Sequence, residues 1–216
     1  MNTLLKNLTI KNNFMFAAVM SDEENCKGFL ERVLPIKINY VEINTEKNIV
    51  YHPEYKGVRL DVYAKDENNT RYNIEMQVLK QPALGRRSRY YQSQMDMELL
   101  AKGCEYAELP ASLKDGRCIV FLNTCGRNEE NIPQELLSFL KFVHADLKES
   151  QKDFQDDYVR QVQKSVTDIK ASREMEERFM LLEELLKDEH RQGVQEGIQK
   201  GIQKGELKAT REILEM

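Results

Sequence analysis

The sequence predicts a mixed α/β (α+β) fold, with a β-hairpin between helices and a helical extension on its C-terminal side. The stretch 57–78 alternates apolar and polar residues at a period of two, which is typical of half-buried strands. The stretches 8–34 and 84–102 repeat apolar residues at helical spacing. The stretches 131–148 and 152–190 follow the same helical period, and the second is heavily charged. Together these observations predict helices, a hairpin, a further helix and a helical C-terminal part.

The hairpin has two acidic residues, Asp61 and Glu75, on its polar face. Two registers are open. A pairing symmetric about Asn68 sets Asp61 directly opposite Glu75, with Cβ atoms roughly 5 Å apart. A two-residue turn at Asn68 and Asn69 would instead oppose Asp61 to Met76 and put the carboxylates on opposite faces. We expect an odd-length loop, because only the first register brings the two carboxylates together.

Two carboxylates that face each other repel unless a cation lies between them, and oxygen ligands of this kind suit Mg²⁺ or Mn²⁺. Gln77 lies two residues after Glu75 on the same face, where its amide could orient water or a phosphate oxygen. The simpler alternative is a solvated hairpin with ordinary surface carboxylates. Spacing alone leaves both interpretations open.

These residues resemble a known signature. Asp61, thirteen intervening residues and then Glu75-x-Gln77 resemble the PD-(D/E)XK nuclease motif, with Gln77 in the lysine position. Further phrases are similar to the recombination-promoting nuclease (Rpn) or transposase-like family of that superfamily. They are Leu8–Phe16, Gly57–Tyr63, Tyr72–Gln77 and Arg87–Gln92, followed by Gly103-x-x-Tyr106, Phe121–Thr124 and a glycine-repeat tail. The resemblance covers most of the chain.

The resemblance implies a restriction-endonuclease-like core of αβββαβ order, with a mixed sheet flanked by helices. It also implies a metal-dependent DNA endonuclease of low sequence specificity, linked to mobile elements, recombination or defence. Asp61, Glu75 and Gln77 would be catalytic, and Asp61 and Glu75 would hold Mg²⁺ or Mn²⁺. Glu31 is a further metal-ligand candidate on a preceding helix, although its position off the apolar stripe also suits a solvated residue. The alternative is a catalytically degenerate nuclease fold that binds DNA or protein.

The elements before the hairpin follow local signals. Two helices are expected within 8–34. The second is predicted to open on the capping box Ser21-x-x-Glu24 and to end at Pro35. Alternating apolar residues from Ile36 to Tyr40 predict a first strand.

A basic helix is predicted after the hairpin, from about Leu84 to Lys102. The chain has no acidic residue between Val78 and Met95. A local basic groove beside the carboxylates would contact the phosphate backbone of DNA. The alternative is a solvated basic face that balances the acidic tail. The candidate DNA-binding residues are Lys80, Arg86, Arg87, Arg89 and Gln94.

The apolar run Cys118–Asn123 predicts a further buried strand. The chain reaches it from Tyr106 in one short connection, where the resemblance implies a longer segment. Either this strand closes the αβββαβ core, or the sheet is one strand short.

The C-terminal part is predicted to be helical, beginning with a helix from Asn131, its cap, to Lys148. Glycine then recurs every four residues from Gly193 to Gly205. Each glycine costs a helix about 1 kcal/mol relative to alanine. The tail is therefore either disordered or a helix whose glycines permit close contact, in a homo-oligomer or with a partner. The predicted parts are a nuclease-like core (1–130), a helical extension (131–190) and the glycine-repeat tail (191–216).

Composition predicts a cytoplasmic protein of one domain with appendages. The chain has 216 residues, of which 31% are charged and 41% hydrophobic. No apolar run approaches the ~20 residues of a membrane span, and the four cysteines lack the spacing of a zinc site. A net charge of −4 argues against DNA binding over the whole surface but allows a local groove. Neither a membrane partner nor a small-molecule cofactor is expected.

Overall fold

The computed structural model describes residues 4–49, 58–78, 83–101, 118–126, 129–130 and 132–214. The chain forms two compact units, Met1–Ile169 and Lys170–Met216. The first unit holds the sheet and the helices that pack on it. The predicted three-part division into 1–130, 131–190 and 191–216 stays a prediction.

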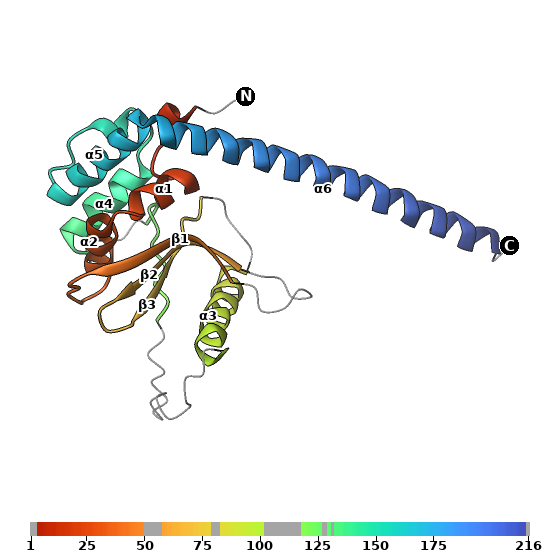
Figure 1. The fold of residues 1–216 in the computed structure, drawn as a ribbon, viewed down its shortest axis with the longest axis horizontal. Helices are drawn as coiled ribbons and strands as arrows, with labels where there is room; N and C mark the ends of the chain where they lie inside the picture. The colour runs from red at the N-terminus through yellow and green to blue at the C-terminus, as the bar shows by residue number, and fades with distance from the viewer. Residues whose placement is uncertain are drawn as a thin grey trace. The chain divides into compact units, whose positions relative to one another are not determined.

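In the described part of the chain, a three-stranded antiparallel sheet lies at the centre of the first unit (Figure 1). Its strands are β1 (Val41–Ile49), β2 (Val58–Asp66) and β3 (Arg71–Ile74), in the order β1-β2-β3. From Leu60 to Ala64, every second side chain of the central strand is completely buried, which is the expected result of a period-two pattern. These residues are Leu60, Val62 and Ala64. The expected α+β class is confirmed.

Helices lie on both sides of this sheet (Figure 1). On one side, α1 (Asn13–Met20) and α2 (Glu23–Val33) contact β1. On the other, α3 (Leu84–Ala101) contacts β1 and adds Tyr91 and Met95 to a small cluster around Tyr63. The predicted helices within 8–34 and from Leu84 are therefore confirmed.

Two further helices complete the core of the first unit, α4 (Gln134–His144) and α5 (Asp157–Ala171). Phe139 of α4 lies between two rings, with centroids 5.4 Å from Phe29 and 5.6 Å from Tyr158. A Cβ on Gly28 would come within 2.6 Å of the Tyr158 ring, so α2 and α5 approach closely only because this residue is glycine. The short 3₁₀ turn η1 (Leu5–Asn7) precedes α1, and η3 (Glu149–Gln151) lies between α4 and α5.

A buried polar residue also ties α2 to α5. Asn25 is completely buried, yet its side chain is fully used. Its Nδ2 donates to Val19 O at 3.0 Å and to Ser165 Oγ at 2.9 Å, and its Oδ1 accepts from Gln161 Nε2 at 2.9 Å. Because a buried amide without partners is costly, this network favours one packing of α5 over all others.

Two local predictions are wrong. The cap of α2 is Asp22, which accepts from Asn25 N at 2.9 Å, whereas Ser21 Oγ donates back to Ala18 O. The segment Ile36–Tyr40 is irregular, and the first strand begins only at Val41. Side chains take the backbone donors that a sheet would otherwise use: Ile38 N donates to Glu31 and Asn39 N to Glu67.

The predicted strand Cys118–Asn123 is also wrong, because this segment is irregular and no ladder joins it to the sheet. Its apolar side chains are exposed, including Phe121 at 59%. An apolar run becomes a strand only where a neighbour takes its backbone hydrogen bonds. The connection after Tyr106 and the predicted cap Asn131 lie outside the described residues.

The turn of the β2–β3 hairpin is built around Asp66. Its Oδ1 accepts from Asn68 N at 2.9 Å and from Thr70 N at 2.8 Å, and its Oδ2 accepts from the Tyr72 hydroxyl at 2.7 Å. Asn69 adopts a left-handed backbone with φ of 61°, which asparagine tolerates better than most residues.

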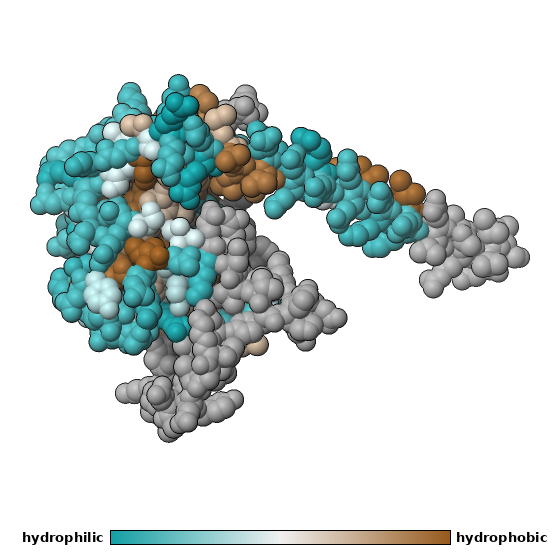
Figure 2. Space-filling view, viewed as in Figure 1, coloured by the Kyte–Doolittle hydropathy of each residue, from teal (hydrophilic) through white to brown (hydrophobic). Residues whose placement is uncertain are grey.

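The second unit consists almost entirely of α6 (Arg173–Leu214), a single helix of 42 residues that includes the glycine repeat. Apolar side chains appear along this otherwise hydrophilic helix in Figure 2. Among the residues that the structure describes, no helix combines the length and the apolarity needed to cross a membrane.

Candidate active site

The register of the hairpin brings Asp61 and Glu75 together. Val62 pairs with Ile74 and Lys65 with Arg71, so the pairing is symmetric about Asn68, as predicted. The ladder ends at Ile74, and the next step of the same register reaches Asp61 and Glu75.

Backbone donors tie the two carboxylates to opposite arms of the hairpin. Glu75 Oε1 accepts from Asp61 N at 3.4 Å, and Asp61 Oδ2 accepts from Met76 N at 3.1 Å. Each carboxylate thus holds the backbone of the facing arm, which fixes the pair at the open end of the hairpin.

Glu75 is an unusual carboxylate. Burial, followed by the charge of Asp61, raises its pKa from 4.5 to about 7, although hydrogen bonds from Asp61 N and Asn73 and the charge of Arg87 oppose this rise. Its side chain keeps 25% of its surface exposed, so it stays accessible to solutes. Two close carboxylates in a half-buried site are costly when both are ionised, and a cation between them removes that cost.

Arg87 of α3 extends to this carboxylate pair. Its Nη2 lies 3.5 Å from Glu75 Oε2, and its Nη1 donates to Gln77 Oε1 at 3.3 Å. At the other end of the guanidinium, Nε donates to the Tyr91 hydroxyl at 2.8 Å. Tyr91 was not among the site residues predicted from sequence; the signal was its spacing of four residues from Arg87, which puts both on one side of a helix.

The other predicted residues divide into three groups. Arg86 and Arg89 are exposed on α3, whereas Gln94 is buried at 8% exposure. Glu31 is used elsewhere, accepting from Ile38 N at 2.9 Å and pairing with Lys37 at 3.3 Å. The backbone hydrogen bond from Ile38 lowers the pKa of Glu31, despite some burial. Lys80 lies outside the described residues.

The carboxylate pair suits a divalent cation. Mg²⁺ commonly takes one or two protein carboxylates and fills its remaining positions with water and substrate phosphate. Asp61 and Glu75 supply such a pair, and the raised pKa of Glu75 marks a place where added positive charge is favourable. No cluster of three or more His, Cys, Asp or Glu side chains that could hold a metal occurs within the described ranges. A pair of carboxylates is the donor set of an open site that leaves positions for water and phosphate.

A carboxylate pair beside an arginine is a set of groups that can hold a divalent ion and stabilise negative charge on a phosphodiester. The sequence matches the family described as PD-(D/E)XK nuclease family transposase over residues 10–204. The chain belongs to this family, which confirms the resemblance found in the sequence. Neither the comparison with curated proteins nor that with solved structures gave a match.

Proposed function

We propose that the chain is a metal-dependent DNA endonuclease of low sequence specificity that uses Asp61 and Glu75 to hold Mg²⁺ or Mn²⁺. Membership of the nuclease family supports this proposal. The observation that carries it is the direct opposition of Asp61 and Glu75 at the open end of the hairpin. In keeping with the family, a role in recombination, transposition or defence is part of the proposal.

Hydrolysis consumes one water: a P–O bond forms to the water oxygen, the P–O bond to one deoxyribose breaks, and the departing oxygen takes up a proton. A divalent ion at the site supplies Lewis-acid stabilisation of the phosphate and activation of water. Gln77 hydrogen-bonds and orients the attacking water, but its amide takes up no proton. Arg86, Arg89 and Lys80 attract the DNA backbone through their positive charge.

Cleavage of supercoiled plasmid by the purified full chain tests the proposal. We expect nicking with Mg²⁺ or Mn²⁺ that stops in EDTA and in Asp61→Ala and Glu75→Ala. Glu42→Ala is the matched control, because Glu42 is a sheet carboxylate 68% exposed whose partner, Lys65, lies 3.8 Å away. If the wild type is inert with both metals while it still binds DNA, the alternative of a degenerate, DNA-binding nuclease fold is correct.

We further propose that α6 joins two copies of the chain. A Cβ added at Gly193, Gly197 or Gly201 meets nothing within 4 Å, so the helix has room there for a close neighbour. Exposed apolar residues accompany the glycines at the same four-residue spacing: Val194, Ile198 and Ile202. A repeated stripe of this kind is self-complementary under two-fold symmetry, which favours a second copy as the partner.

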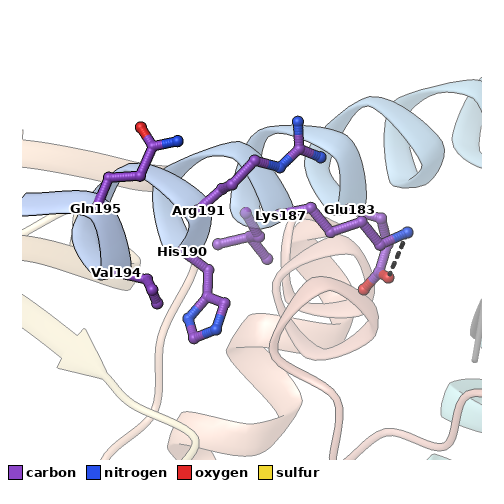
Figure 3. A pocket seen from close by; sticks show the side chains of 7 residues that line it. Glu183, Lys187, His190, Arg191, Val194 and Gln195 are labelled. Carbon is purple, nitrogen blue, oxygen red and sulfur yellow. Dashed lines mark ion pairs between the residues drawn. The ribbon is translucent and has the colours of Figure 1, made fainter. Parts of the chain in front are cut away.

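Mostly charged and polar side chains precede this stripe on α6. Figure 3 shows the side chains along this part of α6, where Glu183 pairs with Lys187 at 3.9 Å and Val194 lies on the lining of a hollow. Light scattering should give a dimer mass for the full chain and a monomer mass after removal of residues from His190 onward. Equal oligomeric states for both would rule the proposal out.

A further inference from the structure

We infer that Arg87 is a catalytic residue: its guanidinium supplies the positive charge that a lysine at the position of Gln77 would otherwise supply. The inference rests on the proposed function and assigns one residue of the basic cluster a role in the chemical step rather than in DNA affinity.

The need for such a charge follows from the chemistry of the motif. Negative charge on the phosphate is redistributed as the P–O bonds form and break, and a fixed cation next to it stabilises the transition state. Gln77 has no charge at any pH. The site therefore needs a cation from another element. That cation must lie next to the end of the Gln77 side chain.

Arg87 meets this geometric requirement. Its Nη1 lies 3.3 Å from Gln77 Oε1, so a charged nitrogen already lies next to the end of that side chain. Its Nη2 lies 3.5 Å from Glu75 Oε2, so the same group borders the carboxylate pair. The side chain is 35% exposed, which leaves the guanidinium accessible to a phosphate.

Tyr91 orients the guanidinium of Arg87. Its hydroxyl accepts from Arg87 Nε at 2.8 Å, and its ring centroid lies 5.0 Å from the guanidinium carbon. Tyr91 itself packs in the buried cluster with Leu60 and Tyr63. A guanidinium held at one end loses little freedom when its other end binds a phosphate, which is the advantage of arginine over a mobile lysine here.

The neighbouring arginines lack this arrangement. Arg86 and Arg89 are exposed on the same helix, at positions rotated away from Arg87 by roughly 100° and 200°. Their expected effect is long-range attraction of DNA, which changes affinity. The effect of Arg87 belongs to the rate of the chemical step.

Single-turnover cleavage of a fluorescent DNA duplex by the full chain separates these roles. The rate at saturating protein is measured with Mg²⁺, and the Kd is measured by anisotropy in EDTA. Arg87→Ala should lower the saturated rate about 10²- to 10³-fold with at most a few-fold change in Kd. Arg86→Ala and Arg89→Ala should instead raise the Kd. Arg173→Ala is the matched control, since Arg173 is 91% exposed on α6.

A rescue variant makes the test decisive. Gln77→Lys introduced into Arg87→Ala should raise the saturated rate at least tenfold above that of Arg87→Ala alone, because it returns a cation to this place in the site. The saturated rate of Arg87→Lys should lie between the rates of the wild type and Arg87→Ala. The Tm of every variant is measured by circular dichroism. If Arg87→Ala has a lowered Tm, the rates of Arg87→Lys and of the double variant decide whether Arg87 acts in the chemical step.

The outcomes separate the two proposals. An active wild type with an equally active Arg87→Ala overturns the role of Arg87 alone. A loss that lies entirely in Kd, or an absence of rescue in a folded double variant, also overturns it. An inert wild type overturns the proposed function and the role of Arg87 with it.

Discussion

The two ends of the β2–β3 hairpin shift the pKa values of their carboxylates in opposite directions. At the turn, Asp66 is 6% exposed and accepts from Asn68 N, Thr70 N and the Tyr72 hydroxyl. Burial raises its pKa, but the bonds from Tyr72, Thr70 and Asn68 outweigh burial and leave the pKa below 3.8. At the open end, Glu75 lies beside a second carboxylate, and its pKa rises to about 7.

The difference lies in burial and in the neighbouring charge, because both carboxylates accept hydrogen bonds but only Glu75 faces a second carboxylate. Asp66 has as many donors as its oxygens need, and it stabilises the fold. Burial and the charge of Asp61 outweigh the hydrogen bonds and the nearby Arg87 at Glu75, so the folded protein favours its protonated form more than the unfolded chain does. A carboxylate that the fold leaves short of positive charge is available to an added cation, whereas a satisfied one is structural.

The largest effect on stability is expected from removing the Asp66 carboxylate at the turn. Asp66→Ala should lower the free energy of unfolding by about 3 kcal/mol, because the Tyr72 hydroxyl and two backbone donors lose their acceptor. Urea denaturation at pH 7 measures this change, with Glu42→Ala as a control expected within about 0.5 kcal/mol. Because the folded pKa of Asp66 is lowered, its contribution is present at pH 7 and is lost as pH falls below 3.8 through the folded pKa. A loss under about 1 kcal/mol would contradict the proposed importance of this turn.

Removing the charge of Glu75 at the open end of the hairpin should have the next largest effect, and it should raise stability rather than lower it. Glu75 has a raised pKa, so the native state keeps its proton between pH 4.5 and about 7, and wild-type stability falls as pH rises through that window. In EDTA, Glu75→Gln should therefore be more stable than wild type by about 2 kcal/mol at pH 8. At pH 4 the two should be equal. Thermal melts at both pH values measure the difference, and a gain independent of pH would refute the explanation.

A smaller loss is expected from removing one donor at the turn. Tyr72→Phe deletes the hydroxyl that lies 2.7 Å from Asp66 Oδ2 while keeping the ring. We expect a loss of about 1 kcal/mol, since two backbone donors still satisfy the carboxylate. The same urea titration detects it, and a loss as large as that of Asp66→Ala would mean that the backbone donors contribute nothing.

The smallest effect is expected at the left-handed residue of the turn. Asn69→Gly should change stability by no more than about 0.5 kcal/mol, because glycine adopts a φ of 61° without strain but gains freedom in the unfolded chain. A large loss would show that the Asn69 side chain supports the turn, a role for which its exposed position gives no basis.

Sequence alone predicts the hairpin well. Alternation defines the faces of β2 and β3, and the requirement that two carboxylates share a face selects the register that the pairs Val62–Ile74 and Lys65–Arg71 confirm. The helices from Asn13 and Leu84 are likewise predictable, because apolar residues at helical spacing give a strong local signal.

The rest depends on tertiary partners. β1 is rich in polar residues, so it is a strand because β2 pairs with it rather than because of its own pattern. Cys118–Asn123 is apolar yet irregular, since apolarity supplies no hydrogen-bonding neighbour. The reach of Arg87 to Glu75 follows from where α3 lies against the sheet, which no spacing along the chain predicts.

The turn around Asp66 has a consequence for how this chain tolerates insertions and deletions. Side chains alternate between faces, so the facing of Asp61 and Glu75 depends on whether the number of residues between them is odd or even. Loss of a single residue from the turn moves the two carboxylates to opposite faces unless a new bulge absorbs it. Loss of two residues keeps them on the same face. Length changes in this loop should therefore be tolerated in steps of two, so that its parity is inherited more strictly than its sequence.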